Sequence, residues 1–331
     1  MKKVLALLLA AAMVFSLSAC GNAAATAPAA TEAAKAEAAP EVKDANGDDE
    51  IFVALLAQCT NGFYFKKYIA TFEEICKENG YKYVVMDANF DAPTQISQIE
   101  NAIAQGVDAI FLTTVDSSAV VEAVKKAYDA GIPVMTGHAQ LVEDAWDYIV
   151  GFAGSSQEEI GTNTGKLIHE ATGGKGKMVV IGSSFGTKDI DTYEACVKKE
   201  AGEGVEWIAE YDHGWDRTKA YEAMENALTQ YDDIDIVWSM DDNTAIGCVN
   251  AIQDAGREGI KVVGINGQDI AFDAIKEGTM YGTVIQSPGD NVKLMFKQWD
   301  AWKKGEDYEF LSYSESPIIT KDNVDKFEPA F

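Results

Sequence analysis

The feature that most constrains this chain is the regular alternation of short apolar runs and amphipathic helical patterns from Ile51 onward. The apolar runs have the length of strands, and between them apolar residues recur three and four positions apart. Such an alternation predicts parallel sheets with right-handed crossovers. The predicted strands are residues 51–57, 81–86, 109–112, 133–135, 148–150, 177–181, 205–209, 234–239, 261–265 and 281–285.

The pattern repeats about five times, is interrupted near residues 151–156, and repeats about five times more. One large sheet is compatible with this order, and two sheets of about five strands each fit it better. The body after residue 50 is long enough for two lobes, each with its own core. We therefore expect an α/β fold with two doubly wound parallel-sheet lobes and a functional site at the carboxyl ends of the strands.

The N-terminus has the features of an export signal. Lys2 and Lys3 precede an apolar stretch over residues 4–17, which is too short for a membrane-spanning helix of about 20 residues. The stretch ends in Leu-Ser-Ala-Cys20, which resembles the lipobox of bacterial lipoproteins. The resemblance implies a signal peptide over residues 1–19 and a lipidated Cys20, the alternative being an ordinary secretory signal.

Charge and cysteine content exclude several classes of partner and site. The formal net charge is −26, which argues against nucleic acid and against anionic membrane surfaces as partners. Residues 20–49 are rich in Ala, Thr, Pro and acidic residues, and we expect them to form a flexible lipidated tether. We favour free, buried thiols over disulfides for the widely spaced Cys59, Cys76, Cys196 and Cys248.

The loop after the first predicted strand carries an amide and several aromatic residues. Asn61 is followed by Phe63 and Tyr64, which are candidate ligand contacts, whereas Phe65 shares the helical core stripe with Ile69. An amide can make paired hydrogen bonds to hydroxyl groups, and an aromatic face can cover the apolar face of a sugar ring. The loop therefore predicts a site for a small polar ligand.

Three motifs together resemble the type I periplasmic sugar-binding proteins, the ribose-binding proteins especially. They are the segment 51–65, Gly-Ile-Pro-Val-Met-Thr over 131–136, and Val-Val-Gly-Ile-Asn-Gly over 262–267. The resemblance runs from residue 51 to the C-terminus. It implies a multi-strand hinge near residues 151–155, 287–289 and 313–317. The implied N-terminal lobe is residues 50–154 plus 287–315, and the implied C-terminal lobe is residues 155–286 plus 316–331.

The resemblance also implies which residues bind the ligand. The matching positions are Asn61, Phe63, Tyr64, Asp116, His138, Asp191, Trp215, Asp241, Asn266 and Gln286. Among them, His138 and Asp191 occupy positions where the family has charged residues. His138-Ala139 departs from an Asp-Arg pair of the family, and Asp191 falls near a family arginine. Two interpretations remain open: the ligand or Lys188 supplies a positive charge, or some acids point to solvent.

A hydrolase is the alternative from another class. Gly-Ser-Ser-Phe-Gly over 182–186 matches the G-x-S-x-G nucleophile elbow with Ser184 as nucleophile, but His213 is the only histidine downstream and leaves little room for an acid. His138, His169 and His213 lack metal-ligand spacing, and no GxGxxG loop precedes a helix. We expect no enzyme activity, no cofactor and no metal.

The sequence therefore predicts a monomeric extracytoplasmic solute-binding lipoprotein, anchored to the bacterial cell membrane through Cys20. Its expected ligand is a monosaccharide or sugar-like polyol, and its expected partners are an ABC permease and ATPase. The alternative within the same fold is a sensor for a chemoreceptor or kinase, with an amine-bearing small molecule or a nucleoside as ligand.

Overall fold

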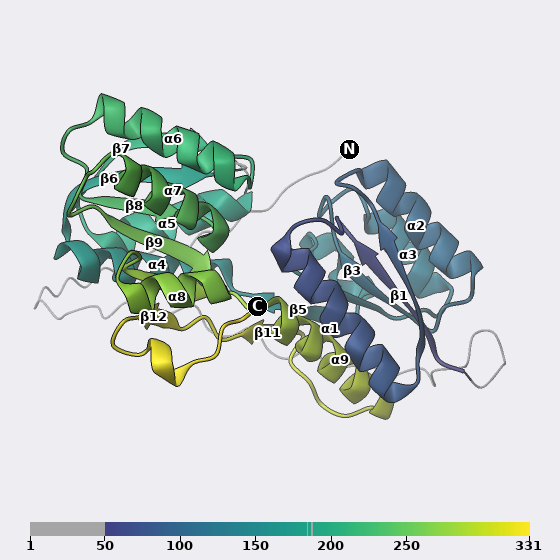
Figure 1. The fold of residues 1–331 in the computed structure, drawn as a ribbon. Coiled ribbons are helices and arrows are strands. Elements are labelled where there is room, and N and C mark those ends of the chain that lie inside the picture. Colours follow the sequence, from purple (N-terminus) through teal and green to yellow (C-terminus); the bar gives the residue numbers. More distant parts are fainter. Residues whose placement is uncertain (1–49, 184, 187) are drawn as a thin grey trace, which may run out of the picture. The chain divides into compact units, whose positions relative to one another are not determined.

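The computed structural model of this chain describes residues 50–183, 185–186 and 188–331. The predicted signal peptide, Cys20 and the tether lie outside the described residues, as does Ser184. Two six-stranded sheets make up the body, each covered by helices on both faces (Figure 1).

The first sheet has the strand order β11-β5-β4-β3-β1-β2, and every neighbouring pair is parallel. Its strands are β1 (Phe52–Ala57), β2 (Lys82–Asp87), β3 (Ala109–Thr113), β4 (Val134–Gly137), β5 (Gly151–Ser155) and β11 (Leu311–Ser314). The helices of this lobe are α1 (Phe63–Asn79), α2 (Ala92–Ala104), α3 (Val121–Asp129), the 3-10 helix η1 (Glu143–Tyr148) and α9 (Pro288–Lys304). Helices α1 and α9 lie side by side on one face and share a core with Phe72, Phe111 and Trp299.

The second sheet has the order β12-β10-β9-β8-β6-β7 and is parallel except for the antiparallel pair of β10 and β12. Its strands are β6 (Lys175–Gly182), β7 (Gly204–Asp212), β8 (Ile236–Ser239), β9 (Lys261–Asn266), β10 (Gly282–Ile285) and β12 (Ile318–Thr320). The helices are α4 (Gln157–Thr172), α5 (Lys188–Ala201), α6 (Arg217–Gln230), α7 (Asp242–Asp254), α8 (Asp269–Glu277) and the 3-10 helix η2 (Val324–Lys326). The α4–α5 pair packs on one core, and α6, α7 and α8 pack on another.

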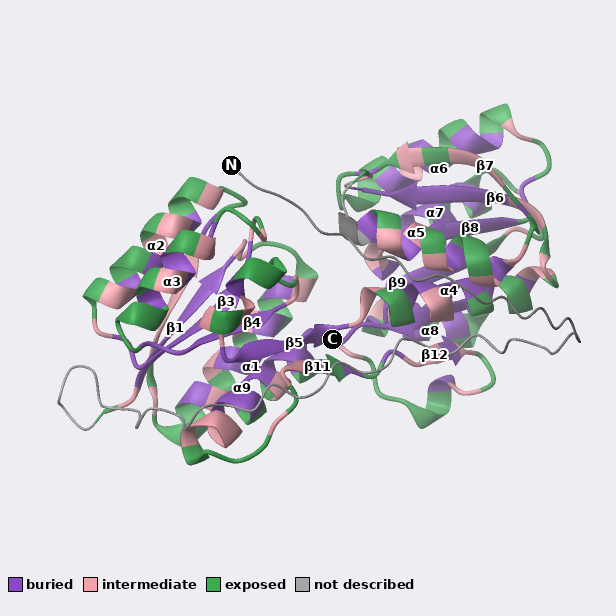
Figure 2. Ribbon diagram, turned by 180° about the vertical axis from the view of Figure 1, so that it is seen from behind, coloured by how far each residue is buried: buried purple, intermediate pink, exposed green. Residues whose placement is uncertain are grey.

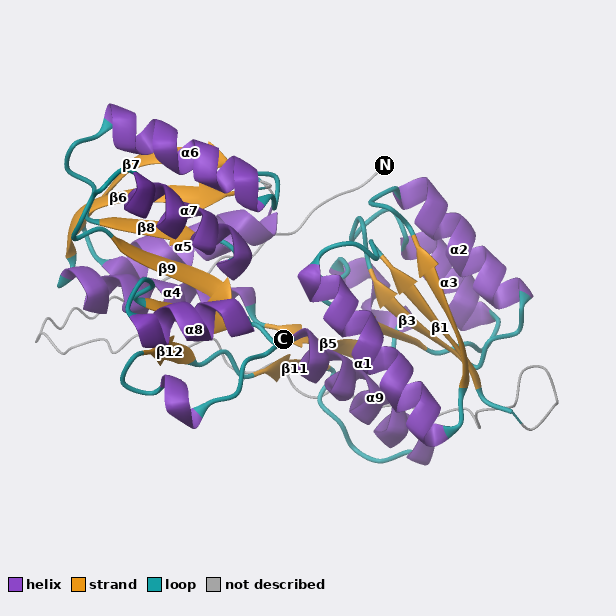
Figure 3. Cartoon of the chain, in the orientation of Figure 1, coloured by secondary structure: helices purple, strands orange, loops and turns teal. Residues whose placement is uncertain are grey.

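The expected fold class, with two doubly wound sheets, is confirmed. Apolar strands are buried between helices whose outer faces are exposed (Figure 2), and strands and helices alternate along the chain (Figure 3). Gly80, Gly131 and Gly256 follow the ends of helices with φ values of 70°, 77° and 61°, a left-handed conformation that glycine adopts without a steric penalty.

One predicted strand is wrong, and two strands of the structure, β11 and β12, were not predicted from the apolar pattern. Residues 148–150 are not a strand, because η1 extends to Tyr148 and the strand β5 begins only at Gly151. Strand β5 contains two glycines, which the pattern treats as breakers. A Cβ on Gly151 would lie 2.6 Å from the carbonyl oxygen of Phe310, so the close approach of β11 requires glycine there. The short strands β11 and β12 carry too few apolar residues for a periodic signal.

The chain passes between the two sheets after β5, after β10 and after β11. Asn291, in the first turn of α9, holds residues next to these passages together. Its Nδ2 donates to Ser155 Oγ at 3.2 Å and to Tyr64 Oη at 2.8 Å, and its Oδ1 accepts from Ser314 Oγ at 2.8 Å. Because Asn291 is fully buried, this polar network fixes the Tyr64 hydroxyl to the passages.

Candidate functional site

Most of the predicted site residues lie at the carboxyl ends of parallel strands. Asp116 follows β3, His138 follows β4, Trp215 follows β7 and Asp241 follows β8, while Asn266 ends β9 and Gln286 follows β10. Asn61 lies in the loop after β1, and Phe63 and Tyr64 begin α1. Asp191 lies instead inside α5. Ligands of open α/β sheets bind at this edge.

The aromatic residues after β1 have different environments. Phe63 is 59% exposed, with Lys66 Nζ 5.9 Å from its ring centroid, so one face is available for contact. Burial raises the pKa of Tyr64, and its ring lies 5.1 Å from the His138 ring. Phe65 is buried in accordance with its predicted place in the core stripe. Phe63 and Tyr64 thus present aromatic surface beside Asn61.

His138 occupies the loop after β4 in a left-handed backbone conformation, with φ 65°. Its ring also lies 5.0 Å from the Phe65 ring, and its Nδ1 is buried without a hydrogen-bond partner in the described part of the chain. Burial lowers the pKa of His138 to about 4. The imidazole is therefore neutral near pH 7 and can offer one donor and one acceptor to a ligand.

Trp215 packs against a buried histidine, His213. Its φ is 61°, its side chain is 49% exposed, and its backbone N–H donates to His213 Nδ1 at 2.8 Å. The two rings meet nearly edge to face at 5.5 Å. His213 itself is fully buried, and burial lowers its pKa to about 4. His213 directly follows Asp212, the last residue of β7.

Asp241 is the N-cap of α7, and it accepts hydrogen bonds from the backbone of α7 and from two side chains at the end of β9 and just after it. Its Oδ1 accepts from the backbone N–H of Thr244 at 3.0 Å. Its Oδ2 accepts from Asn266 Nδ2 at 2.7 Å and from Gln268 Nε2 at 3.2 Å. Burial raises the pKa of this carboxyl, whereas these hydrogen bonds favour its ionised form. Asp241 and Asn266 therefore act together as one polar cluster.

Asp242 does not line the site. It is fully buried beneath the sheet edge, where it accepts hydrogen bonds from Thr283 Oγ1 at 2.7 Å and from the Gln268 backbone N–H at 2.9 Å. Burial raises the pKa of this carboxyl well above its ordinary value. A Cβ on Gly264 would collide with the Asp242 carboxylate, which explains the glycine in the Val-Val-Gly-Ile motif. Asp242 is a structural acid.

The three predicted acids of the site have different environments. Asp116 is exposed, and hydrogen bonds from the Ala119 backbone N–H and from Ser118 lower its pKa. Asp191 is exposed. Burial raises the pKa of Asp241, and the charge of Arg217 opposes that rise, while Arg217 Nε donates to the Asn243 carbonyl at 3.0 Å. Asp241 therefore has hydrogen-bond donors and a nearby guanidinium within the chain itself.

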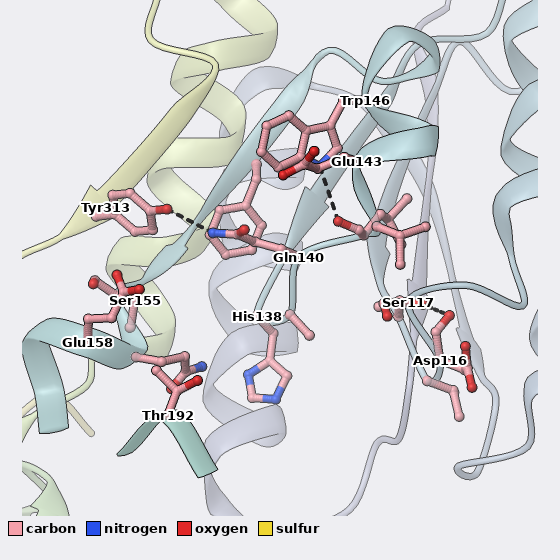
Figure 4. A pocket seen from close by; sticks show the side chains of 18 residues that line it. Asp116, Ser117, His138, Gln140, Glu143, Trp146, Ser155, Glu158, Thr192 and Tyr313 are labelled. Atoms are coloured by element: carbon pink, nitrogen blue, oxygen red, sulfur yellow. Dashed lines mark hydrogen bonds between the residues drawn. The ribbon is translucent and has the colours of Figure 1, made fainter. Parts of the chain in front are cut away.

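A cavity of about 540 Å³ lies beside His138. Figure 4 shows the His138 ring between Asp116 and Ser117 on one side and Glu158 and Thr192 on the other. At its rim, Gln140 Nε2 donates to Tyr313 Oη at 2.7 Å. Among the described residues, no group of three or more histidines, cysteines and acids is arranged to hold a metal. The described cysteines Cys59, Cys76, Cys196 and Cys248 are free thiols.

Comparison with known proteins decides the family. The family model of the periplasmic binding protein domain matches residues 52–307 of this chain.

The chain belongs to the periplasmic binding protein family.

Its relatives include the xylitol-binding protein of Mycolicibacterium smegmatis, 31% identical over 75% of this chain and 71% of that protein. The ribose import binding protein of Bacillus subtilis is 28% identical over 72% of this chain and 77% of that protein. Among solved structures, an ABC transporter solute-binding protein of Bacillus halodurans with bound myo-inositol has a TM-score of 0.76. It is 25% identical and covers 86% of this chain and 100% of its own. The predicted resemblance to type I periplasmic sugar-binding proteins is confirmed.

Backbone conformation singles out three predicted residues of this periplasmic binding protein. In the described part of the chain, the non-glycine residues with positive φ are Asn89, Phe90, His138, Trp215 and Asn266. Three of these five are predicted ligand contacts, and Asn266 has a φ of 112°. Such conformations cost on the order of 1–3 kcal/mol each and gather at functional sites.

Sequence reasoning missed several residues around the cavity of this periplasmic binding protein. Gln140 stands two positions after His138 and could have been found from that neighbourhood. Glu158 and Thr192 gave no signal, because Glu158 is an exposed residue of α4 and Thr192 is a half-buried polar residue of α5. Tyr313 lies in β11, which the apolar pattern does not reveal.

Proposed function

We propose that this protein is an extracytoplasmic solute-binding lipoprotein that captures a monosaccharide or sugar-like polyol for ABC-type import. The observation that carries the proposal is the left-handed backbone of His138, Trp215 and Asn266, each at the carboxyl end of a different strand. Strain of this kind persists only where the surrounding structure maintains it, which is typical of a ligand site. The names of the relatives, for xylitol and ribose, supply the ligand class.

The chemistry of the residues fits a neutral polyhydroxylated molecule. The carboxylate of Asp241 and the amides of Asn61, Asn266 and Gln286 can accept from and donate to hydroxyl groups. The exposed rings of Phe63 and Trp215 can cover an apolar C–H face. Because the nearby acids already have hydrogen-bond donors, a neutral ligand fits better than an amine-bearing one.

Capture by two lobes follows from the proposed division into residues 50–154 plus 287–315 and residues 155–286 plus 316–331. Contacts from both lobes to one ligand favour the conformation in which both can reach it. The delivery partners are an ABC permease and ATPase, which recognise the loaded protein. Sensing by a chemoreceptor or kinase would use the same capture step.

The proposed anchor is the lipidated Cys20, reached by cleavage after residue 19. No helix in the described residues is long and apolar enough to cross a membrane. Two or more acyl chains suffice for stable anchoring. Labelling cells with a radioactive fatty acid tests this directly: the unaltered chain should take up label and Cys20→Ser should not. Equal labelling of both would place the acyl group elsewhere.

The ligand class is tested by thermal unfolding of the full chain, purified in mild detergent, against pentoses, hexoses, polyols, amino sugars, nucleosides and amines. A ligand at about 1,000 times its Kd adds about 4 kcal/mol, a shift of several degrees. Stabilisation restricted to one group of sugars or polyols, and lost in Trp215→Ala, is the expected result. A response to amines or nucleosides alone would refute the sugar proposal and leave the fold assignment intact.

The hydrolase alternative gains nothing from the described residues. Its base would be His213, whose Nδ1 already accepts from the Trp215 backbone and whose ring is fully buried. A general base must be within hydrogen-bond reach of its nucleophile and substrate.

A further inference from the structure

The last residues of the chain return to the loop that holds the Asp241 cluster. The backbone N–H of Ala330 donates to the Gly267 carbonyl at 2.7 Å, and the Phe331 carbonyl accepts from the Asp269 N–H at 2.9 Å. Ala330 also packs on the core formed by α6, α7 and α8. Residues 330–331 are therefore fixed beside Asn266 and Gln268, the partners of Asp241.

From this position the Phe331 ring reaches the aromatic group of the other lobe. Its centroid lies 6.2 Å from that of Tyr64, with the ring planes at 88°, which is a favourable edge-to-face arrangement. Tyr64 cannot move away freely, since its hydroxyl accepts from the buried Asn291. Phe331 is only partly buried, so part of its ring remains available to another molecule.

Phe331 thus joins Tyr64, a predicted ligand contact of the first lobe, to the loop that follows Asn266 in the second. Its backbone is attached to the loop after β9, and its side chain contacts the start of α1. It lies beyond residues 52–307, which match the family model, so the family match assigns it no role.

We propose that Phe331 forms a wall of the ligand site and determines which sugars or polyols bind. This inference rests on the proposed function and adds a residue to it. A phenyl ring has no hydrogen-bonding group, so it favours a ligand that turns an apolar C–H face toward Tyr64 and Phe331. It also limits the size of a ligand held between Tyr64 and the Asn266 loop.

The test measures affinity of the full chain in mild detergent by titration calorimetry, with D-ribose, xylitol and myo-inositol as probes. Phe331→Ala should weaken the best binder by about 10- to 100-fold, the range for loss of a buried aromatic contact. Phe331→Tyr keeps the ring and should retain affinity within about threefold. The matched control is Phe327→Ala, because Phe327 belongs to the same C-terminal segment but is 38% exposed, and this change should leave affinity unaltered.

The outcomes separate the two proposals. If the unaltered chain binds no sugar or polyol in any panel, the proposed function fails. If it binds one and Phe331→Ala binds equally well with the same order of preference, the role of Phe331 is refuted while the proposed function stands. Unfolding midpoints without ligand show whether Phe331→Ala is folded. If it is not, weak binding by the folded Phe331→Tyr overturns the inference and retained binding supports it.

Discussion

The backbone of Trp215 makes an unusual prediction, because replacing this residue by glycine should yield a more stable protein than replacing it by alanine. Trp215 has a φ of 61°. This conformation costs a residue with a Cβ about 1–2 kcal/mol and costs glycine nothing. Glycine loses more chain entropy on folding, by about 0.5–1 kcal/mol. Trp215→Gly should therefore exceed Trp215→Ala in unfolding free energy by about 0.5–1 kcal/mol.

Both variants keep the backbone N–H that donates to His213 Nδ1, so that hydrogen bond does not contribute to the difference. Both lack the indole, so both should fail to bind ligand. The assay is equilibrium urea unfolding without ligand, followed by circular dichroism, with the free energy taken from midpoint and slope.

A matched pair of variants at an ordinary helical position should give the opposite sign. Glu222 is exposed within α6, so Glu222→Gly should be less stable than Glu222→Ala by about 1 kcal/mol. If Trp215→Gly is no more stable than Trp215→Ala while the Glu222 pair behaves as expected, residue 215 is not held in the left-handed conformation. Only His138 and Asn266 would then remain as strained residues of the proposed ligand site.

Three further predictions concern buried groups. The pKa of Asp242 is raised in the folded chain, so the native state holds a proton that the unfolded state releases, and stability falls as pH rises through the folded pKa. In Asp242→Asn the unfolding free energy should fall less steeply with pH, by up to about 1.4 kcal/mol per pH unit. Urea unfolding at a series of pH values measures this, and parallel curves for the two proteins would contradict the prediction. Burial lowers the pKa of both His138 and His213 to about 4, so each stabilises the folded state by an amount that is lost as pH falls below about 6.5, roughly 2 kcal/mol each at pH 5. Replacing either histidine by Asn should reduce the loss of unfolding free energy between pH 7 and pH 5 by that amount. An unchanged pH profile would show that the histidine is solvated. A Cβ on Gly161 would lie 2.9 Å from the Tyr193 carbonyl oxygen, where α4 packs on α5. Gly161→Ala should therefore lower the unfolding free energy by about 1–3 kcal/mol. Its ligand affinity should be retained, which calorimetry with the best-binding sugar can check.

Most of the fold follows from local patterns. The buried strands β1, β3 and β9 are continuous apolar runs, and the stripe of Phe72 and Cys76 on α1 is readable from its spacing. Strand β5 was not predicted, because Gly151 is required by the close approach of Phe310, next to β11 and far away in sequence. No local pattern records such a close approach.

The same division applies to the site. The sequence predicts an export signal, and it determined the α/β class and the strand ends at which Asp116, His138 and Asp241 stand, because each depends on residues adjacent in the chain. Which charges need a partner was decided only by tertiary structure. Asp241 accepts hydrogen bonds from Asn266 and Gln268 at the end of β9, and the Phe331 ring contacts that of Tyr64, far away in sequence. Burial and hydrogen-bond partners arise when distant segments meet, so residue type alone does not reveal them.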